Sequence, residues 1–284
     1  MKKIVYLFVC LGVILFSACA DDVPTSVKDN SNIRIELSEY EDASALHSIV
    51  LDCAAEIVKE QNIDLDQLTQ PQVYTVTQDA VLRGVQKYIS QREGRSLTST
   101  EQNTLKAEVS NYWNDSSSRA LMKKIAQSST PINPNTGNAD LNTLYTRCKI
   151  KPEAQKYLNK MFGNMDLPNY ESYLDGLVMD VWSTASGLSS DEKLSLINVI
   201  TVTKDSYQYW NRNVPMTRLS RTAKSIIISD AVGGVWGFFR GLGRSAGSLI
   251  FGPGGAVLTI TGSVIVGAAE SSVGAAITEG LLRI

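Results

Sequence analysis

Apolar side chains recur at three- and four-residue intervals through most of this chain, the spacing that places them on one face of an α-helix. The first clear stripe predicts a helix from about Tyr40 to Glu60, and a weaker one predicts a second helix from Pro71 to Gln91. Alternation of apolar and polar residues, the pattern of a half-buried strand, is scarce. The expected fold class is therefore all-α, an irregular multi-helix domain with a glycine-rich helical hairpin at its C-terminal end.

Helix-start signals divide the middle of the chain into further helices. Thr98 and Glu101 have the spacing of a capping box, and Ser189 and Glu192 repeat it before a helix that runs to about Trp210. Proline suits the first turn of a helix because it has no N–H to leave unpaired. Further apolar stripes predict helices over 105–113, 121–126, 141–148, 152–163 and 173–182, with a loop at 129–138.

The last sixty residues differ in composition from the rest. From Ser225 onward the chain is poor in charge, and thirteen of its 20 glycines lie between Gly233 and Gly280. Small residues fall every fourth position in two runs, which makes a smooth groove along one side of a helix. A Gly-Pro-Gly-Gly turn at 252–255 separates the two runs, so we expect a hairpin over 229–251 and 256–282. The helix-packing residues expected in it are Gly233, Gly237, Gly241, Gly247, Gly267, Ser271 and Ala275.

Each glycine inside a helix destabilises it by about 0.8–1 kcal/mol relative to alanine. Helices with so many glycines therefore need another source of stability, either close packing or a membrane. Arg240 and Arg244 disfavour a membrane-spanning first arm, and the uncharged stretch 256–269 spans only about 21 Å as a helix. The segment resembles the glycine-zipper stretches of membrane-active peptides, including class II bacteriocins and pore-forming hairpins. Packing within the protein or a partner, conditional membrane insertion and self-assembly all remain open.

The N-terminal residues resemble the leader of a bacterial lipoprotein. Two lysines precede an uncharged, mostly apolar run that ends in Ser17-Ala18-Cys19. The resemblance implies a signal peptide over 1–18, lipidation at Cys19 and a tether over 19–37. Ala20, in place of aspartate, is compatible with sorting to the cell outer membrane. The following Asp21-Asp22 resembles the export signal of surface lipoproteins in Bacteroidetes-type bacteria.

These boundaries leave a helical domain over 38–224 and the glycine-zipper hairpin over 225–284. Two cysteines remain after the leader and the lipidation site are set aside, Cys53 and Cys148. Both fall on apolar helix faces in an exported chain, where the compartment is oxidising. A disulfide between them and a pair of buried free thiols are equally compatible with the sequence.

The candidate chemistry is sparse. A net charge of -2, with 27 basic and 29 acidic residues, gives no footprint for nucleic acid. His47 is the only histidine, and its position predicts a helix-surface residue. The chain has no HExxH, CxxC or P-loop motif, so we expect no metal site, no cofactor and no enzyme activity. The aromatic residues at 112–113 and 207–210 are expected to serve core packing.

Two classes of function follow. In the first, an envelope-anchored lipoprotein uses its hairpin for helix packing, self-assembly or membrane interaction, and a bacteriocin-like role is its sharpest form. In the second, a surface-exposed binding lipoprotein uses the helical domain as its ligand- or partner-binding module. The partners expected are a membrane, reached through the N-terminal lipid, and a second copy or another envelope protein.

Overall fold

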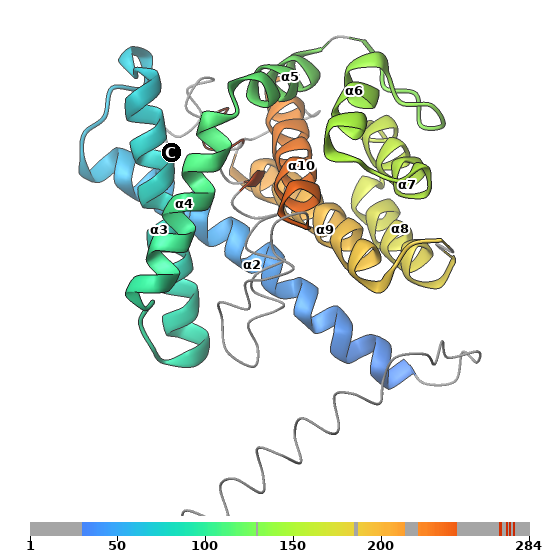
Figure 1. The fold of residues 1–284 in the computed structure, drawn as a ribbon, viewed down its shortest axis with the longest axis horizontal. Coiled ribbons are helices and arrows are strands. Elements are labelled where there is room, and N and C mark those ends of the chain that lie inside the picture. Colours follow the sequence, from blue (N-terminus) through green and yellow to red (C-terminus); the bar gives the residue numbers. More distant parts are fainter. Residues whose placement is uncertain are drawn as a thin grey trace, which may run out of the picture. The chain divides into compact units, whose positions relative to one another are not determined.

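A computed structural model describes residues 30–128, 130–184, 187–213 and 221–242. It also describes residues 267, 268, 271, 273 and 275, which we call the C-terminal segment. Every regular element in these ranges is a helix (Figure 1), so the expected all-α multi-helix fold is confirmed. The chain divides into two compact units, Met1–Ser38 and Glu39–Ile284.

The first helix begins earlier than its apolar stripe. Helix α2 spans Asn30–Glu60, so residues 30–37, which the sequence assigns to the tether, are helical. Residues 30–37 carry no regular apolar period, which is why the pattern places the start near Tyr40. The expected signal peptide, Cys19 and the rest of the tether lie outside the described residues.

The second unit continues as a series of helices joined by short connections. Residues 130–138 contain no helix and belong to the loop predicted from its prolines, and an isolated bridge joins Asn133 and Gly137. Helices α4 and α5 are separated by Asp115, whose side chain caps α5 by accepting from the Ser118 amide. The bounds are η1 (Leu65–Gln67), α3 (Gln70–Glu93), α4 (Ser99–Asn114), α5 (Ser116–Gln127), α6 (Ala139–Cys148), α7 (Pro152–Gly163), α8 (Tyr170–Thr184), α9 (Ser190–Asn213) and α10 (Arg221–Leu242).

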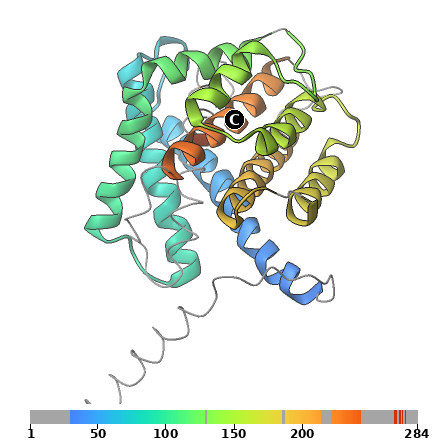
Figure 2. The same cartoon turned by 45° about the vertical axis from the view of Figure 1, so that its right-hand side comes forward.

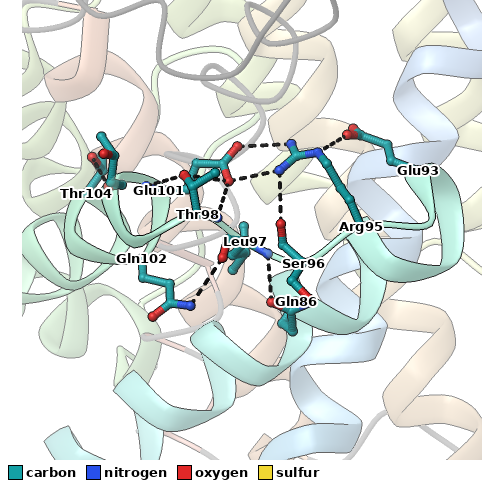
Figure 3. Close-up of polar contacts among 10 residues, drawn as sticks. Gln86, Glu93, Arg95, Ser96, Leu97, Thr98, Glu101, Gln102 and Thr104 are labelled. Carbon is teal, nitrogen blue, oxygen red and sulfur yellow. Dashed lines mark hydrogen bonds and ion pairs between the residues drawn. The ribbon is translucent and has the colours of Figure 1, made fainter.

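Both predicted capping boxes are present. At the start of α4 the Thr98 hydroxyl accepts from the Glu101 amide at 3.2 Å, and the Thr98 amide donates to the Glu101 carboxylate at 2.7 Å (Figure 3). Arg95 adds a bidentate ion pair, with both terminal nitrogens 2.9 Å from the Glu101 oxygens. The hydrogen bond from Arg95 lowers the pKa of Glu101, with the Thr98 bonds acting in the same direction. Ser189 and Glu192 make the equivalent exchange before α9.

Helix α10 is the buried centre of the second unit. Every residue from Ile226 to Gly237 is buried, and the helix packs against α5, α6 and α9 (Figures 1 and 2). The boundary predicted between residues 224 and 225 falls inside α10, so the first glycine-rich helix belongs to the helical domain. In the part of the chain that the structure describes, no helix is long and apolar enough to cross a membrane.

Candidate functional site

Helix α10 meets the C-terminal segment through contacts at backbone level. A Cβ atom placed on Gly233 would overlap the carbonyl oxygen of Gly267 and lie 2.7 Å from the Cβ of Ser271. A Cβ atom on Gly267 would overlap the carbonyl oxygen of Gly233 and lie 3.1 Å from the Cα of Gly237. Carbon atoms in contact are normally about 3.5–4.0 Å apart, so a larger residue at Gly233 or Gly267 requires the backbone to shift.

The order of these contacts shows how the two segments run. Gly233 lies next to Ser271, and Gly237 lies next to Gly267. Residue numbers therefore rise along α10 as they fall along the C-terminal segment, which is the order that a hairpin requires. The described residues of that segment are helical. The predicted turn at 252–255 lies outside the described residues.

Aromatic side chains hold the C-terminal segment against α4 and α10. The Tyr112 hydroxyl hydrogen-bonds the Ser271 hydroxyl at 2.8 Å inside the protein. The Tyr112 ring stands edge-on to the Trp236 ring, with centroids 5.1 Å apart. The indole nitrogen of Trp236 donates to Asp115 at 3.4 Å. The core-packing role expected for the aromatic residues at 112–113 and 207–210 is confirmed for Tyr112, Tyr209 and Trp210, which are buried.

The structure describes only some of the other residues that the sequence predicts for helix packing and lipidation. Gly241 lies in α10, in the part of the helix whose side-chain surroundings are not described, and Ala275 is helical and half-buried. Gly247 lies outside the described residues, as does Cys19.

Cys53 and Cys148 are both free and buried, on α2 and α6. Of the two alternatives that the sequence left open, the structure contains the buried thiols. Burial raises the pKa of Cys53 and raises that of Cys148 to about 12. A thiol is nucleophilic only when ionised, so both side chains behave as small apolar residues.

His47 is not on the surface, and the expectation of a helix-surface histidine is wrong. Its ring is fully buried between carboxylates from two other helices. Its Nδ1 lies 2.8 Å from Asp205 Oδ2 on α9, and its Nε2 lies 3.7 Å from Asp230 Oδ2 on α10. We call these three residues the carboxylate–histidine cluster.

Serine hydroxyls donate to both carboxylates of this cluster. Ser44 and Ser48, one helical turn apart on α2, each donate to Asp205 Oδ1 at 2.9 Å. Ser206 on α9 donates to Asp230 Oδ2. The serines therefore satisfy carboxylate oxygens on either side of the His47 ring.

The sequence contained a signal for this cluster. His47 precedes the buried Val50 and Ala54 by three and seven residues, which places it on the buried stripe of α2. Asp230 is the only charged residue in the run from Ser225 to Phe239. A lone charge in an apolar helix needs partners, and Ser206 and His47 both lie beside Asp230.

The chemistry available at these sites is limited. Within the described ranges no group of three or more histidine, cysteine, aspartate or glutamate side chains could hold a metal ion. The hydroxyls of the cluster donate to carboxylates and none is activated by the His47 ring, so the arrangement is not that of a catalytic triad. Neither a family model, nor a curated protein, nor a solved structure matches this chain.

Proposed function

We propose that this chain is a lipid-anchored protein of the bacterial outer membrane. In this proposal its glycine-rich hairpin is stored inside the helical domain and is the element that engages a membrane. The observation that carries the proposal is the complete burial of α10 from Ile226 to Gly237, joined to the C-terminal segment by glycine contacts. A helix buried on all sides belongs either to the centre of a protein or to a bilayer.

The lipid at Cys19 supports this use of the hairpin. A lipoprotein carries more than one acyl chain, and each buried CH₂ contributes about 0.8 kcal/mol to anchoring. The anchor would keep the domain beside a bilayer, so a hairpin released from the domain would meet lipid before it met another protein. The helices around α10 would then have to separate from it.

Charge on α10 makes this engagement conditional. Asp230 lies within the buried run, and Arg240 follows it near the end of the helix. An aspartate or arginine at the centre of a bilayer costs about 2.5–3.5 kcal/mol on insertion scales. The hairpin is therefore proposed to remain in the domain until some change releases it.

A surface-exposed binding lipoprotein is the second candidate, and one observation favours it. The glycine faces of α10 and of the C-terminal segment already pack against each other inside the domain. If that packing is permanent, the hairpin is purely structural, and the outer faces of the surrounding helices carry the function.

Vesicle flotation of the mature chain without its lipid separates the two candidates. The chain from residue 20 onward is mixed with dye-loaded vesicles of phosphatidylethanolamine and phosphatidylglycerol and centrifuged through a density gradient. The proposal predicts that protein floats with the vesicles and that dye is released. A chain that remains at the bottom of the gradient, with no dye released, contradicts membrane engagement and favours the binding lipoprotein.

A matched pair of substitutions assigns the effect to the hairpin. Ile260→Asp places a charge in the uncharged stretch 256–269 and is expected to abolish dye release. Met179→Asp makes the same kind of change on α8, at a side chain that is 44% exposed, and should leave dye release unchanged. Equal loss in both variants would show that the hairpin is not the membrane-active element.

A further inference from the structure

We propose that Arg119, stacked on Trp113, binds a phosphate group. Trp113 on α4 contacts both Tyr74 of α3 and Arg119 of α5, and these helices are neighbours (Figures 1 and 2). We call the three residues the aromatic–arginine cluster. The inference rests on the proposed function, because a bilayer beside the domain would supply the phosphate as a lipid headgroup.

The Arg119 guanidinium is held in place by an aromatic ring. Its Cζ lies 4.6 Å from the centroid of the Trp113 ring, which is the geometry of a cation–π contact. The Tyr74 ring stands edge-on to Trp113, with centroids 5.5 Å apart. The Tyr74 hydroxyl in turn hydrogen-bonds the Ser110 hydroxyl at 2.9 Å. The stack therefore fixes the plane of the guanidinium before any ligand arrives.

The charge of Arg119 is not neutralised by a carboxylate of the residues that the structure describes. The nearest candidate by sequence is Asp115, four residues earlier, and its carboxylate accepts from the Ser118 amide and the Trp236 indole instead. Arg119 and Trp113 are both half-buried. A half-buried cation without an acceptor is costly, so the arrangement favours an anion from outside the chain.

The edge of the guanidinium sets how that anion would bind. Arg119 Nε and Trp113 Nε1 are enclosed by protein, and neither has a hydrogen-bond acceptor. The terminal nitrogens Nη1 and Nη2 of Arg119 are not enclosed in this way, so they are the donors that a ligand can reach. Two parallel N–H groups in one plane match two oxygens of a phosphate, which gives a bidentate pair.

The surroundings of Arg119 suit a lipid headgroup. Tryptophan and tyrosine side chains gather at the headgroup level of membrane proteins, because their rings are apolar and each carries one polar group. Tyr74 and Trp113 place two such rings beside the arginine, and both are half-buried. A free phosphate ion offers the same oxygens without the lipid, and the experiment below separates the two sources.

The test is a titration of the full mature chain, from residue 20 onward and without its lipid, followed by nitrogen-15 spectra. The signals read are the Arg119 Nε–H and the Trp113 indole N–H, assigned from the variants Arg119→Lys and Trp113→Phe. The titrants are dihexanoyl-phosphatidylglycerol below its micelle concentration, sodium phosphate and sodium acetate, all at constant ionic strength. Both signals should shift and saturate with the lipid, which should bind about tenfold more tightly than phosphate or acetate.

A matched pair of variants assigns the binding to the stacked arginine. Arg119→Lys keeps the positive charge and removes the planar fork, so the lipid should bind about tenfold more weakly, as read from the Trp113 signal. Arg147→Lys makes the same change at an exposed arginine of α6, which donates to Ser117 at 3.0 Å. It should leave the affinity unchanged. If Arg119→Lys does not fold, the wild-type titrations decide.

Absence of a saturable shift with both phosphate compounds would overturn the site, and so would a folded Arg119→Lys variant that binds as the wild type does. Acetate binding as tightly as the lipid would assign the site to carboxylates and overturn the phosphate assignment. Equal affinity for the lipid and for phosphate would keep the phosphate site and contradict a lipid source.

Vesicle flotation separates this site from the proposed function. A chain that binds dihexanoyl-phosphatidylglycerol at Arg119 and does not float with vesicles would support the site and contradict membrane engagement by the hairpin. A chain that floats and releases dye without any shift at Arg119 or Trp113 would support the proposed function and overturn the site.

Discussion

At the scale of single residues, identity matters most where two backbones touch or where a charge is buried. Gly233 and Gly267 leave no room for a side chain, while a Cβ on Gly176 in α8 would meet nothing within 4 Å apart from the adjoining part of its own helix. His47 and Asp230 are fully buried and lie beside each other. These positions allow predictions in which chemically similar changes have opposite effects.

Replacing Gly233 by alanine should destabilise the protein by about 1–3 kcal/mol, because the new methyl group overlaps the Gly267 carbonyl. Gly176→Ala should stabilise it by roughly 0.5–1 kcal/mol, because alanine loses less backbone entropy in a helix and meets no obstacle. Urea unfolding followed by circular dichroism measures both. Equal effects of the two changes would show that α10 and the C-terminal segment do not pack closely.

The two buried thiols should be unreactive in the native state. The pKa of Cys148 is raised to about 12 by burial, and that of Cys53 is raised for the same main reason. In the mature chain without lipid, Ellman's reagent should detect almost no thiol at pH 8 and two thiols after unfolding in guanidinium without a reductant. Detection of no thiol after unfolding would indicate a disulfide instead.

At the scale of elements, local rules describe the helix starts and miss the long-range partners. Thr98 with Glu101 and Ser189 with Glu192 contain their whole interaction within four residues, so spacing alone predicts them. The apolar pattern predicts a start for α2 near Tyr40, ten residues after its true start at Asn30, because residues 30–37 lack an apolar stripe. The partners of His47 are 158 and 183 residues away along the chain, and no local pattern brings them together.

The capping network at α4 should depend on pH in a defined direction. Because the pKa of Glu101 is lowered, its contribution is present above about pH 4.5 and is lost as the pH falls through the folded-state value. Glu101→Gln keeps the capping acceptor and removes the charge that Arg95 binds, at a cost of about 1 kcal/mol at neutral pH. Unfolding free energies measured between pH 3 and pH 7 should converge at the acid end. A constant difference would contradict this role.

At the scale of the whole molecule, the proposed function combines an N-terminal lipid anchor with a helical domain that holds a glycine-rich hairpin. The all-α class and close packing between Gly233 and Ser271 were both expected from the sequence. What the periodicity could not tell was where that packing occurs, since small residues every fourth position suit a soluble core as well as a membrane. Helix α10, which contains the first glycine run, is buried by α5, α6 and α9 inside the helical domain.

Removal of the lipidation site tests the anchor independently of the hairpin. If Cys19 is lipidated as proposed, Cys19→Ala should move the protein from the membrane pellet to the soluble fraction of the producing cell, because the lost acyl chains would have held it to the membrane. Immunoblots of the two fractions after a carbonate wash measure the change. A variant that remains in the pellet would place the anchor elsewhere in the chain.

The most direct measurement of the central claim is contact between α10 and lipid. Trp236 is buried in α10, and it can be made the sole fluorophore by changing the other three tryptophans to phenylalanine. The matched control retains only Trp182, which is half-buried in α8. The proposed function predicts that vesicles with brominated acyl chains quench Trp236 and leave Trp182 unchanged. Unquenched Trp236 in vesicle-bound protein would contradict it.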